Sequence, residues 1–259
     1  MPARVVFIGA GPGAADLITV RGARQLALAD VVLFDALTDP ALREHAPHAV
    51  WLDVGKRGFG QATGQEAINA LLVRQAQQVG EHGVVVRLKG GDPSILGRLE
   101  EELQAVAAAG IPCEVVPGVT AALAAAAHSK RPLTRRGAGR SVSLGTAMTC
   151  NGLRHGGRHA ATEVIYMAGR QLAALGRALR QAGWPASTPV SVVSRAGWPD
   201  CLHSDHTVQT LGAAAMLHAG RPTVVTVGAG ADVLQSVGPR ATKTLPIDSA
   251  QAASRVAVA

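Results

Sequence analysis

Short runs rich in Val and Ile alternate along this chain with Ala- and Leu-rich stretches at helical spacing. This alternation is typical of proteins in which crossover helices connect the strands of parallel sheets. We therefore expect an α/β protein. The strands expected in the first half are Val5–Ile8, Val31–Phe34, Val50–Val54, Val84–Leu88 and Glu114–Val116, and the helices are Val20–Ala29, Gln65–Val79 and Glu100–Ala109.

The second half repeats the alternation less regularly. Its expected strands are Ser141–Leu144, Glu163–Met167, Pro189–Val193 and Thr223–Val227, and its helices are Ala121–His128 and Leu172–Ala182. Pro117 and Gly118 follow a strand and precede an Ala-rich helix, a position at which Pro and Gly often interrupt the chain. We expect two α/β domains, 1–117 and 118–238, and then a loose tail, 239–259, in which apolar residues show little periodicity.

The composition excludes several classes of protein. Hydrophobic residues make up 47% of the chain and charged residues 17%, a balance typical of a globular protein. The longest apolar stretch, Val119–Ala127, is far shorter than the roughly 20 residues that span a bilayer, and the N-terminus lacks the pattern of a secretion signal. Three widely separated cysteines fit free thiols better than a disulfide framework. We expect a cytoplasmic protein that does not bind or cross a membrane.

The formal net charge of +7 favours an anionic partner. Nucleic acid, an acidic membrane surface and a small polyanion all fit this charge, and the basic residues form no long block. Aromatic residues account for only 3% of the chain, which argues against the stacking platforms that bind single-stranded nucleic acid. Nucleic acid is therefore not the partner we expect.

A glycine-rich loop, Gly9-Ala-Gly-Pro-Gly13, follows the first expected strand, and its glycines let the backbone turn sharply and approach a ligand. Asp35 lies near the spacing at which a carboxylate binds a dinucleotide ribose, so an oxidoreductase that binds NAD or FAD is one interpretation. Pro12, however, removes a backbone donor, and Asp16 would place a carboxylate beside a bound pyrophosphate. A plain tight turn and a pocket for another ligand stay open as alternatives.

Five further blocks follow this loop in a fixed order. They are Gly55-Lys-Arg57, Arg87-Leu-Lys-Gly-Gly-Asp-Pro93, Gly97-Arg98 with Glu101, Val116-Pro-Gly-Val-Thr-Ala121 and Pro132-Leu-Thr-Arg-Arg-Gly137. Together with the glycine loop they resemble the tetrapyrrole methylases, and most closely the S-adenosylmethionine-dependent uroporphyrinogen III C-methyltransferases. The resemblance runs from about Val5 to Gly228. It is specific, because the blocks would otherwise have to occur in this order by chance.

The resemblance implies a fold, a reaction and a set of site residues. Members of the family have two α/β domains with the cofactor in the cleft between them, and they commonly form homodimers. The implied reaction moves methyl groups from S-adenosylmethionine to carbons of uroporphyrinogen III, two transfers giving precorrin-2 for siroheme or cobalamin-type tetrapyrroles. The cofactor residues that carry over are Pro12, Gly90, Gly91, Asp92, Ile95, Leu96, Thr120, Ala121 and Met167.

The acceptor side of such a reaction needs groups that hold several carboxylates while a ring carbon is aligned with the methyl group. Arginine suits this task because its planar fork binds a carboxylate bidentately and keeps its charge. Glu101 lies three residues after Arg98, so it can orient Arg98 or accept from a pyrrole N–H, although an exposed helix pair is the plainer interpretation. The candidates, which the resemblance also marks, are Arg98, Glu101 and Arg136, with Lys56 and Arg135 near them in the motifs.

We expect no metal, because a sulfonium methyl is already electrophilic. The histidines of Arg154-His-Gly-Gly-Arg-His159 lie in a glycine-rich segment that gives them no fixed scaffold, so we expect a surface loop there.

Several positions depart from the family pattern. They are Ser94 and Leu96 in place of aromatic residues, Leu99 and Glu100 in place of glycines, and Arg135 and Met148 in place of histidines. We expect methyl transfer to survive these changes, because alignment of the reactants dominates the chemistry. The alternatives within this fold are a later corrin precursor or a ribosomal RNA nucleotide as acceptor, and a member that binds the cofactor with little turnover.

Overall fold

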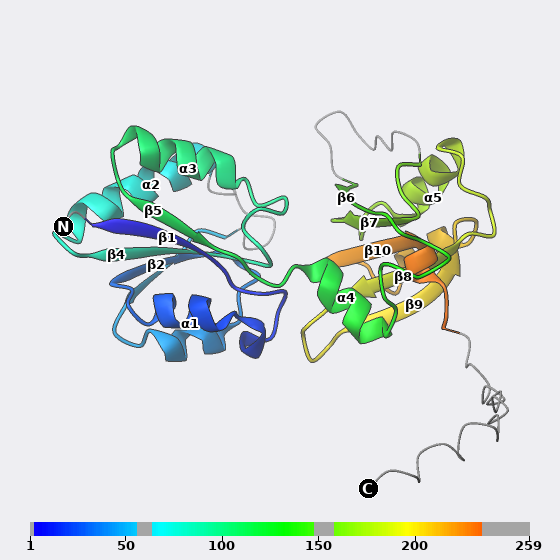
Figure 1. The fold of residues 1–259 in the computed structure, drawn as a ribbon, viewed down its shortest axis with the longest axis horizontal. Helices are drawn as coiled ribbons and strands as arrows, with labels where there is room; N and C mark the ends of the chain where they lie inside the picture. The colour runs from blue at the N-terminus through cyan, green and yellow to red at the C-terminus, as the bar shows by residue number, and fades with distance from the viewer. Residues whose placement is uncertain (1–2, 56–63, 148–157, 235–259) are drawn as a thin grey trace, which may run out of the picture.

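The computed structural model describes residues 3–55, 64–147 and 158–234, which form two five-stranded sheets lying side by side (Figure 1). The first sheet uses strands that precede Pro117, and the second uses strands that follow Gly118. The expected α/β class is confirmed. The domain boundaries stay a prediction, and the expected tail, 239–259, lies outside the described residues.

The first sheet is parallel throughout, with the strand order β3-β2-β4-β1-β5. Its central strands are buried along their length, as expected of parallel strands that helices cover on both faces. The strands are β1 (Arg4–Gly9), β2 (Val31–Phe34), β3 (Val50–Asp53), β4 (Val84–Lys89) and β5 (Cys113–Val116).

Helices cover both faces of this sheet because successive side chains of a strand point to opposite sides. Ile8 packs with Leu26 and Leu42 on one face, whereas Phe7 packs with Leu72 and Val106 on the other. The first face carries α1 (Val20–Leu26) with the 3-10 segments η1 (Ala15–Leu17) and η2 (Pro40–His45), and the second carries α2 (Gln65–Gln78) and α3 (Leu99–Ala108).

The strand order places a topological switch point between β1 and β4. The chain leaves β1 toward β2 and β3, and it leaves β4 in the opposite direction, toward β5. In open α/β sheets, ligands bind in the crevice at the carboxyl ends of the strands beside such a point. The Gly9–Gly13 loop follows β1 and the Gly90–Asp92 turn follows β4, so the fold places both glycine motifs at this crevice.

The second sheet is mixed, with the strand order β6-β7-β10-β8-β9. Its strands are β6 (Val142–Thr146), β7 (Thr162–Tyr166), β8 (Pro189–Ser194), β9 (Leu202–Thr207) and β10 (Thr223–Gly228). The pair β6–β7 is parallel, and the other neighbours are antiparallel. The expectation of parallel sheets is therefore wrong for this half. A buried apolar run does not reveal the direction of its neighbour, and the short β8–β9 loop allows a hairpin but no crossover helix.

Strand β9 was not predicted from the sequence. Its residues include His203, Ser204, Asp205 and His206, so it lacks both an apolar run and a clear alternation. It lies at the edge of the sheet, where one side needs no partner strand and polar residues are common.

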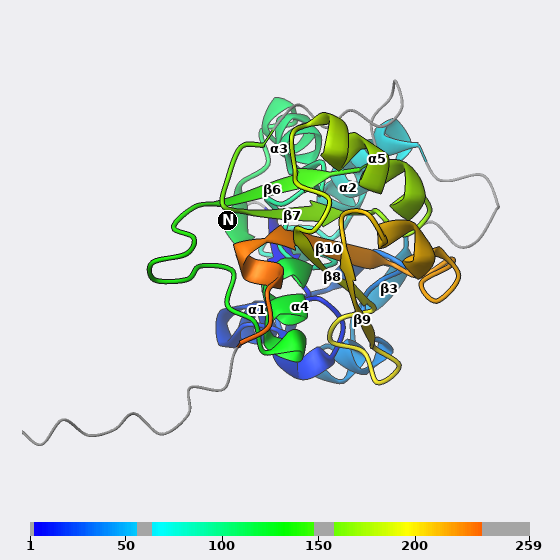
Figure 2. The ribbon, with the colours of Figure 1, turned by 90° about the vertical axis from the view of Figure 1, so that its right-hand side faces the viewer.

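Helices cover the second sheet on both faces (Figure 2). Leu172, Leu175 and Leu179 form an apolar stripe at helical spacing and pack in one core cluster with strand residues of this sheet. This cluster involves α5 (Leu172–Gln181) and the 3-10 segment η3 (Leu211–Ala215), whereas α4 (Ala121–Ser129) packs on the other face and η4 (Ala229–Ala231) follows β10. Within the described residues, no helix combines the length and apolar character needed to cross a membrane.

Candidate active site

Three backbone segments cross at the switch point of the first sheet. Gly11 and Gly91 exchange backbone hydrogen bonds, in which the Gly91 N–H donates to the Gly11 carbonyl at 2.7 Å. Both residues have left-handed φ values, +82° and +71°, that favour glycine. A Cβ on Gly9 would lie 2.5 Å from the Cα of Gly118, and one on Gly118 would lie 2.3 Å from the Gly91 carbonyl oxygen. These glycines are therefore required by the crossing itself.

A pocket lies at this crossing, and we call it the first pocket. All nine residues that the sequence analysis predicted for the cofactor line it: Pro12, Gly90, Gly91, Asp92, Ile95, Leu96, Thr120, Ala121 and Met167. The structure thus brings together residues from four separate stretches of the chain.

Further lining residues were not among those predicted for the cofactor. They are Gly11, Leu37, Tyr166, Val193, Arg195, Ala196, Trp198, Pro222, Thr223 and Val224. Most lie at the ends of β8 and β10, where no motif marks them and where strand pairing alone brings them to the pocket. Gly11 and Tyr166 are different, because they adjoin Pro12 and Met167, and this proximity was a signal that could have identified them.

Asp92 fixes the turn after β4. Its Oδ1 accepts a hydrogen bond from the Ser94 N–H at 2.8 Å, and its Oδ2 accepts one from the Gly118 N–H at 2.9 Å. Each carboxylate oxygen has a second lone pair that these two hydrogen bonds do not use. Asp92 therefore shapes the pocket in addition to lining it.

Tyr166 and Thr120 connect β7 to the start of α4. The Tyr166 hydroxyl lies 2.7 Å from the Thr120 Oγ1. Burial raises the pKa of the Tyr166 phenol, and the hydrogen bond with Thr120 partly opposes that shift. The phenol therefore stays protonated at neutral pH and presents a polar group in a mostly apolar wall.

Non-glycine residues with left-handed backbone gather at this site. Leu96, Arg98, Met167 and Arg195 have φ values of +55°, +55°, +56° and +52°. Such conformations are uncommon for residues with a Cβ and tend to persist where function requires them. Leu96 and Met167 are also 47% and 44% exposed despite being apolar, so their side chains stand in open space that a ligand can cover.

A second pocket adjoins the first and shares Leu37 and Leu96 with it. Arg98, one of the predicted acceptor residues, lines this second pocket. Its Nε and Nη2 donate to the two carboxylate oxygens of Glu101 at 2.7 Å and 2.6 Å. Of the two interpretations of Glu101, the structure shows the pairing with Arg98; both side chains are exposed, and the contact of either residue with an acceptor stays a prediction. The other residues of this pocket are Asp35, Val54, Gly55, Gly64, Gln65, Ile68, Arg87, Lys89 and Gly97.

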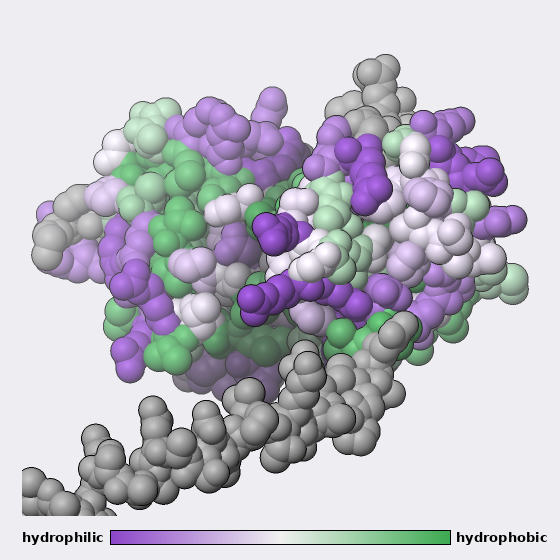
Figure 3. All heavy atoms as spheres, turned by 45° about the vertical axis from the view of Figure 1, so that its right-hand side comes forward, coloured by the Kyte–Doolittle hydropathy of each residue, from purple (hydrophilic) through white to green (hydrophobic). Residues whose placement is uncertain are grey.

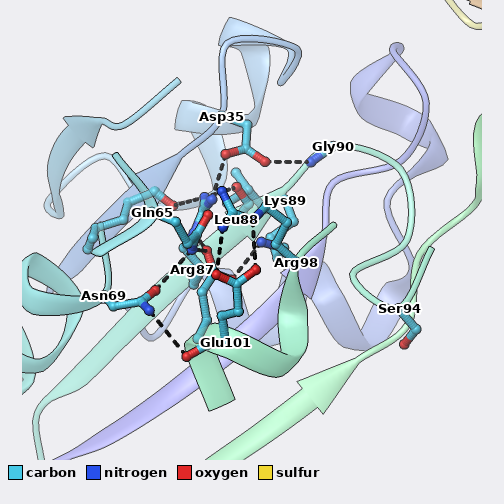
Figure 4. A network of polar contacts seen from close by, with 12 residues as sticks. Asp35, Gln65, Asn69, Arg87, Leu88, Lys89, Gly90, Ser94, Arg98 and Glu101 are labelled. Atoms are coloured by element: carbon cyan, nitrogen blue, oxygen red, sulfur yellow. Dashed lines mark hydrogen bonds and ion pairs between the residues drawn. The ribbon is translucent and has the colours of Figure 1, made fainter. Parts of the chain in front are cut away.

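A buried ionic network forms one wall of the second pocket (Figure 4). Glu102 is fully buried and accepts from Arg87 Nε at 2.9 Å and from Lys89 Nζ at 2.6 Å. Arg87 Nη2 also donates to Asp35 Oδ1 at 2.6 Å. Burial lowers the pKa of Lys89 and the Arg87 charge lowers it further, while Glu102 opposes both effects. The network holds Asp35, whose side chain is one-third exposed, at the edge of the pocket.

Arg136 is exposed and lines neither pocket, so its predicted contact with an acceptor stays a prediction. Its neighbour Arg135 is engaged elsewhere, because its guanidinium donates to the Asp232 carbonyl oxygen and its backbone pairs with Gly139. Lys56, Met148 and the segment from Arg154 to His155 lie outside the described residues. Among the residues that are described, no group of three or more His, Cys, Asp or Glu side chains is arranged to hold a metal ion.

The comparison with protein families matches residues 4–215 to the model described as tetrapyrrole (corrin/porphyrin) methylases. The chain belongs to the tetrapyrrole methylases. Among its relatives, the uroporphyrinogen-III C-methyltransferase of Pseudomonas aeruginosa is 41% identical over 200 residues, which cover 76% of this tetrapyrrole methylase and 80% of the relative.

Solved structures of other proteins resemble this tetrapyrrole methylase over nearly their whole length. One is uroporphyrin-III C-methyl transferase from Thermus thermophilus complexed with S-adenyl homocysteine, with a TM-score of 0.73, 32% identity and coverage of 87% of this chain and 97% of that one. Another is a cobalt precorrin-4 methyltransferase, with a TM-score of 0.76, 29% identity and coverage of 89% and 96%. These similarities confirm the expected tetrapyrrole methylase fold.

Proposed function

We propose that this methylase transfers methyl groups from S-adenosylmethionine to carbon atoms of uroporphyrinogen III, with two successive transfers giving precorrin-2. One observation carries the proposal: a mostly apolar pocket, lined by all nine predicted cofactor residues, opens beside a charged pocket across Leu37 and Leu96. The relative from Pseudomonas aeruginosa, which carries the name of this activity, supports the choice of reaction.

The residues of the first pocket fit the cofactor. Gly90 and Gly91 leave the backbone accessible, while Leu96 and Met167 present exposed apolar surface that the cofactor would cover. Asp92 keeps lone pairs that can accept from an amine or a ribose hydroxyl. When bound, S-adenosylmethionine supplies an electrophilic methyl group. The task of the protein is to align the acceptor carbon with that methyl group and to exclude water.

The residues of the second pocket fit a polycarboxylated acceptor. Arg98 is exposed and, although its Nε and Nη2 hold Glu101, the other edge of its guanidinium, with Nη1, can bind a carboxylate; Arg87 and Lys89 are buried and paired with Asp35 and Glu102. In the sequence, Lys and Arg far outnumber Asp and Glu between residues 118 and 234. This excess lies outside the second pocket, whose lining residues all fall between Asp35 and Arg98, so it attracts a polyanion through the overall field of the protein and not through contacts in this pocket.

We assign Asp35 as the group that accepts the proton released by the acceptor ring after methyl transfer. It is the carboxylate among the described residues that line the second pocket, and its side chain is one-third exposed. Arg87 holds one of its oxygens, and the Gly90 N–H lies 3.4 Å from the other. Asp35 thus lies beside Gly90, the first residue of the turn that lines the first pocket.

We also propose that the protein works as a homodimer in the cytoplasm. Exposed apolar side chains on α4 and on the edge strand β6, Leu123 and Leu144, support a contact with a second copy. Light scattering coupled to size-exclusion chromatography tests this: a mass of two chains is expected, and a monomer at working concentrations would contradict it.

Mass analysis of products tests the acceptor. The protein is incubated with S-adenosylmethionine and, in separate reactions, uroporphyrinogen III, a later corrin precursor and a ribosomal RNA fragment. We expect two added methyl groups on uroporphyrinogen III. Transfer to one of the other acceptors alone would overturn the acceptor, and binding of S-adenosylhomocysteine without any transfer would identify a member that has lost turnover. Binding of NAD or FAD in place of S-adenosylhomocysteine would favour the oxidoreductase interpretation.

A further inference from the structure

Two loops that are far apart in the sequence meet at one side of the first pocket. The loop after β1 contributes Pro12 and Gly13, and the loop after β8 contributes Gly197 and Trp198. The Ala14 N–H donates to the Gly197 carbonyl oxygen at 2.7 Å. We call the contact between Pro12–Gly13 and Gly197–Trp198 the clasp. It joins a loop of the first sheet to a loop of the second.

The clasp is tightly packed. A Cβ on Gly13 would lie 2.5 Å from Cδ1 and 2.6 Å from Nε1 of Trp198, closer than such atoms approach in proteins. Gly13 is buried and has no left-handed φ, so its backbone would accept an alanine and the obstacle is the indole ring together with the Gly197 backbone. Position 13 requires glycine, because Trp198 fills the space that a side chain would occupy.

A charged side chain, itself held by an ionic network, contacts the Trp198 ring. The Arg195 guanidinium lies 4.4 Å from the centroid of the Trp198 ring, a cation–π geometry. Arg195 Nε donates to Asp200 Oδ1 at 2.7 Å, and Arg221 Nη2 donates to the other Asp200 oxygen at 3.0 Å. The ring thus contacts both the Arg195 guanidinium and the glycine loop, and these contacts restrict its movement.

The clasp residues also line the first pocket. Pro12 lines it from one side of the clasp, and Arg195 and Trp198 line it from the other. A large aromatic ring in a pocket wall supplies extensive contact area at little cost in side-chain entropy. Trp198 therefore holds the two loops together and shapes the pocket wall that they form.

We propose that Trp198 is an affinity-determining residue for S-adenosylmethionine, acting by clasping the Pro12–Gly13 loop, and that Arg195 and Asp200 are positioning residues for its ring. The proposal rests on the assignment of the first pocket to this cofactor. It predicts different effects on the binding of the two substrates, because Trp198 lines the first pocket and not the second. Loss of the ring should weaken cofactor binding and leave acceptor binding unchanged.

The experiment is calorimetric titration of S-adenosylhomocysteine into the full chain carrying Trp198→Ala, Trp198→Phe, Gly13→Ala or the double change Gly13→Ala with Trp198→Ala. Trp198→Ala should weaken binding about tenfold and Trp198→Phe by less, which corresponds to roughly 1.4 kcal/mol for the larger effect. Gly13→Ala should weaken binding as well, but its effect should shrink in the Trp198→Ala background, because the added methyl group then meets fewer atoms.

Asp200→Asn should raise the KM for the cofactor and leave the KM for the acceptor unchanged.

Trp51→Phe is the matched control, since Trp51 lines neither pocket, and it should bind like the unchanged protein. Thermal melting of each variant separates loss of binding from loss of fold, and Trp198→Phe and Gly13→Ala carry the comparison if Trp198→Ala does not fold. Unchanged affinity in Trp198→Ala, or effects of Gly13→Ala and Trp198→Ala that simply multiply, would overturn the proposal. Failure of the unchanged protein to bind S-adenosylhomocysteine would instead overturn the proposed function.

Discussion

The Asp92 carboxylate accepts a hydrogen bond from the Gly118 N–H at 2.9 Å, and so joins the turn after β4 to the segment that leads into α4. Its other oxygen holds the Ser94 N–H within the same turn. From the sequence, Asp92 was expected to contact the cofactor. The structure adds a second role, because the carboxylate organises the two glycine-containing segments that line the first pocket.

Asp92→Asn should therefore reduce both stability and cofactor affinity. The amide keeps one acceptor oxygen and places an NH₂ group opposite a backbone N–H, which leaves a donor without its acceptor and costs about 1–3 kcal/mol. Urea denaturation measures the loss of stability, and titration with S-adenosylhomocysteine measures the loss of affinity. An Asp92→Asn protein that binds weakly but has unchanged stability would show that the bonds to Ser94 and Gly118 contribute little.

Arg98→Ala should abolish use of the acceptor and leave cofactor affinity unchanged, because Arg98 lines the second pocket and not the first. The pair with Glu101 is exposed and screened by solvent, so its loss should change stability little. Steady-state kinetics with each substrate varied in turn measures the effect. Arg74→Ala, which removes an exposed arginine from α2, is the control. If Arg98→Ala lost affinity for the cofactor and for the acceptor equally, the assignment of Arg98 to the acceptor would be wrong.

Glu102→Gln should destabilise the protein by about 3–5 kcal/mol, because it removes one charge from a buried network and leaves Lys89 with no carboxylate beside it. Adding Lys89→Met should recover part of that loss, since the uncompensated ammonium is then gone. The free energy of unfolding in urea measures both variants. If Glu102→Gln alone were as stable as the unchanged protein, this network would not contribute to stability as argued.

The sequence predicted one wall of the first pocket because the residues of that wall lie in contiguous motifs. Pro12, the Gly90–Asp92 turn and Thr120 follow strand ends directly, so a linear pattern contains them. The opposite wall, with Val193 and Trp198, depends on the pairing of β8 with β10, and no local signal in the sequence specifies that pairing. This is also why the direction of the second sheet and the polar edge strand β9 could not be predicted.

The second pocket illustrates a signal that was present but not used. Arg87 and Lys89 alternate with Leu88 in a run that is otherwise apolar, so both charges share one face of a buried strand. Two buried cations require an acidic partner, and Glu102 in the first turn of α3 provides it. Which helix would supply that partner depends on how α3 packs on the sheet, and the sequence does not contain this information.

The stability of the second sheet should depend on pH through His218. This residue is fully buried, and its ring nitrogens lie 2.9 Å from Ser194 Oγ and 2.8 Å from Ser204 Oγ. Burial lowers the pKa of His218 below its ordinary value of 6.5, and nearby charge on His206 and Arg221 acts in the same direction. The folded protein therefore binds fewer protons than the unfolded chain below about pH 6.5, so this contribution to stability is present above that pH and is lost as the pH falls.

His218→Gln should make the free energy of unfolding less sensitive to acid, with a smaller loss between about pH 7 and about pH 5 than the unchanged protein shows. Part of the dependence should persist, because burial also lowers the pKa of His203. Urea denaturation at a series of pH values measures the slope. An identical slope in the two proteins would show that His218 does not contribute to it.

The most direct test of the central claim, that the two pockets hold a methyl donor and a tetrapyrrole carbon against each other, is turnover of uroporphyrinogen III with S-adenosylmethionine labelled at the methyl carbon. Nuclear magnetic resonance of the product reports where the label goes. Two labelled methyl groups bonded to ring carbons are the predicted result. A product without label, or one labelled on carboxylate oxygens as methyl esters, would contradict the claim.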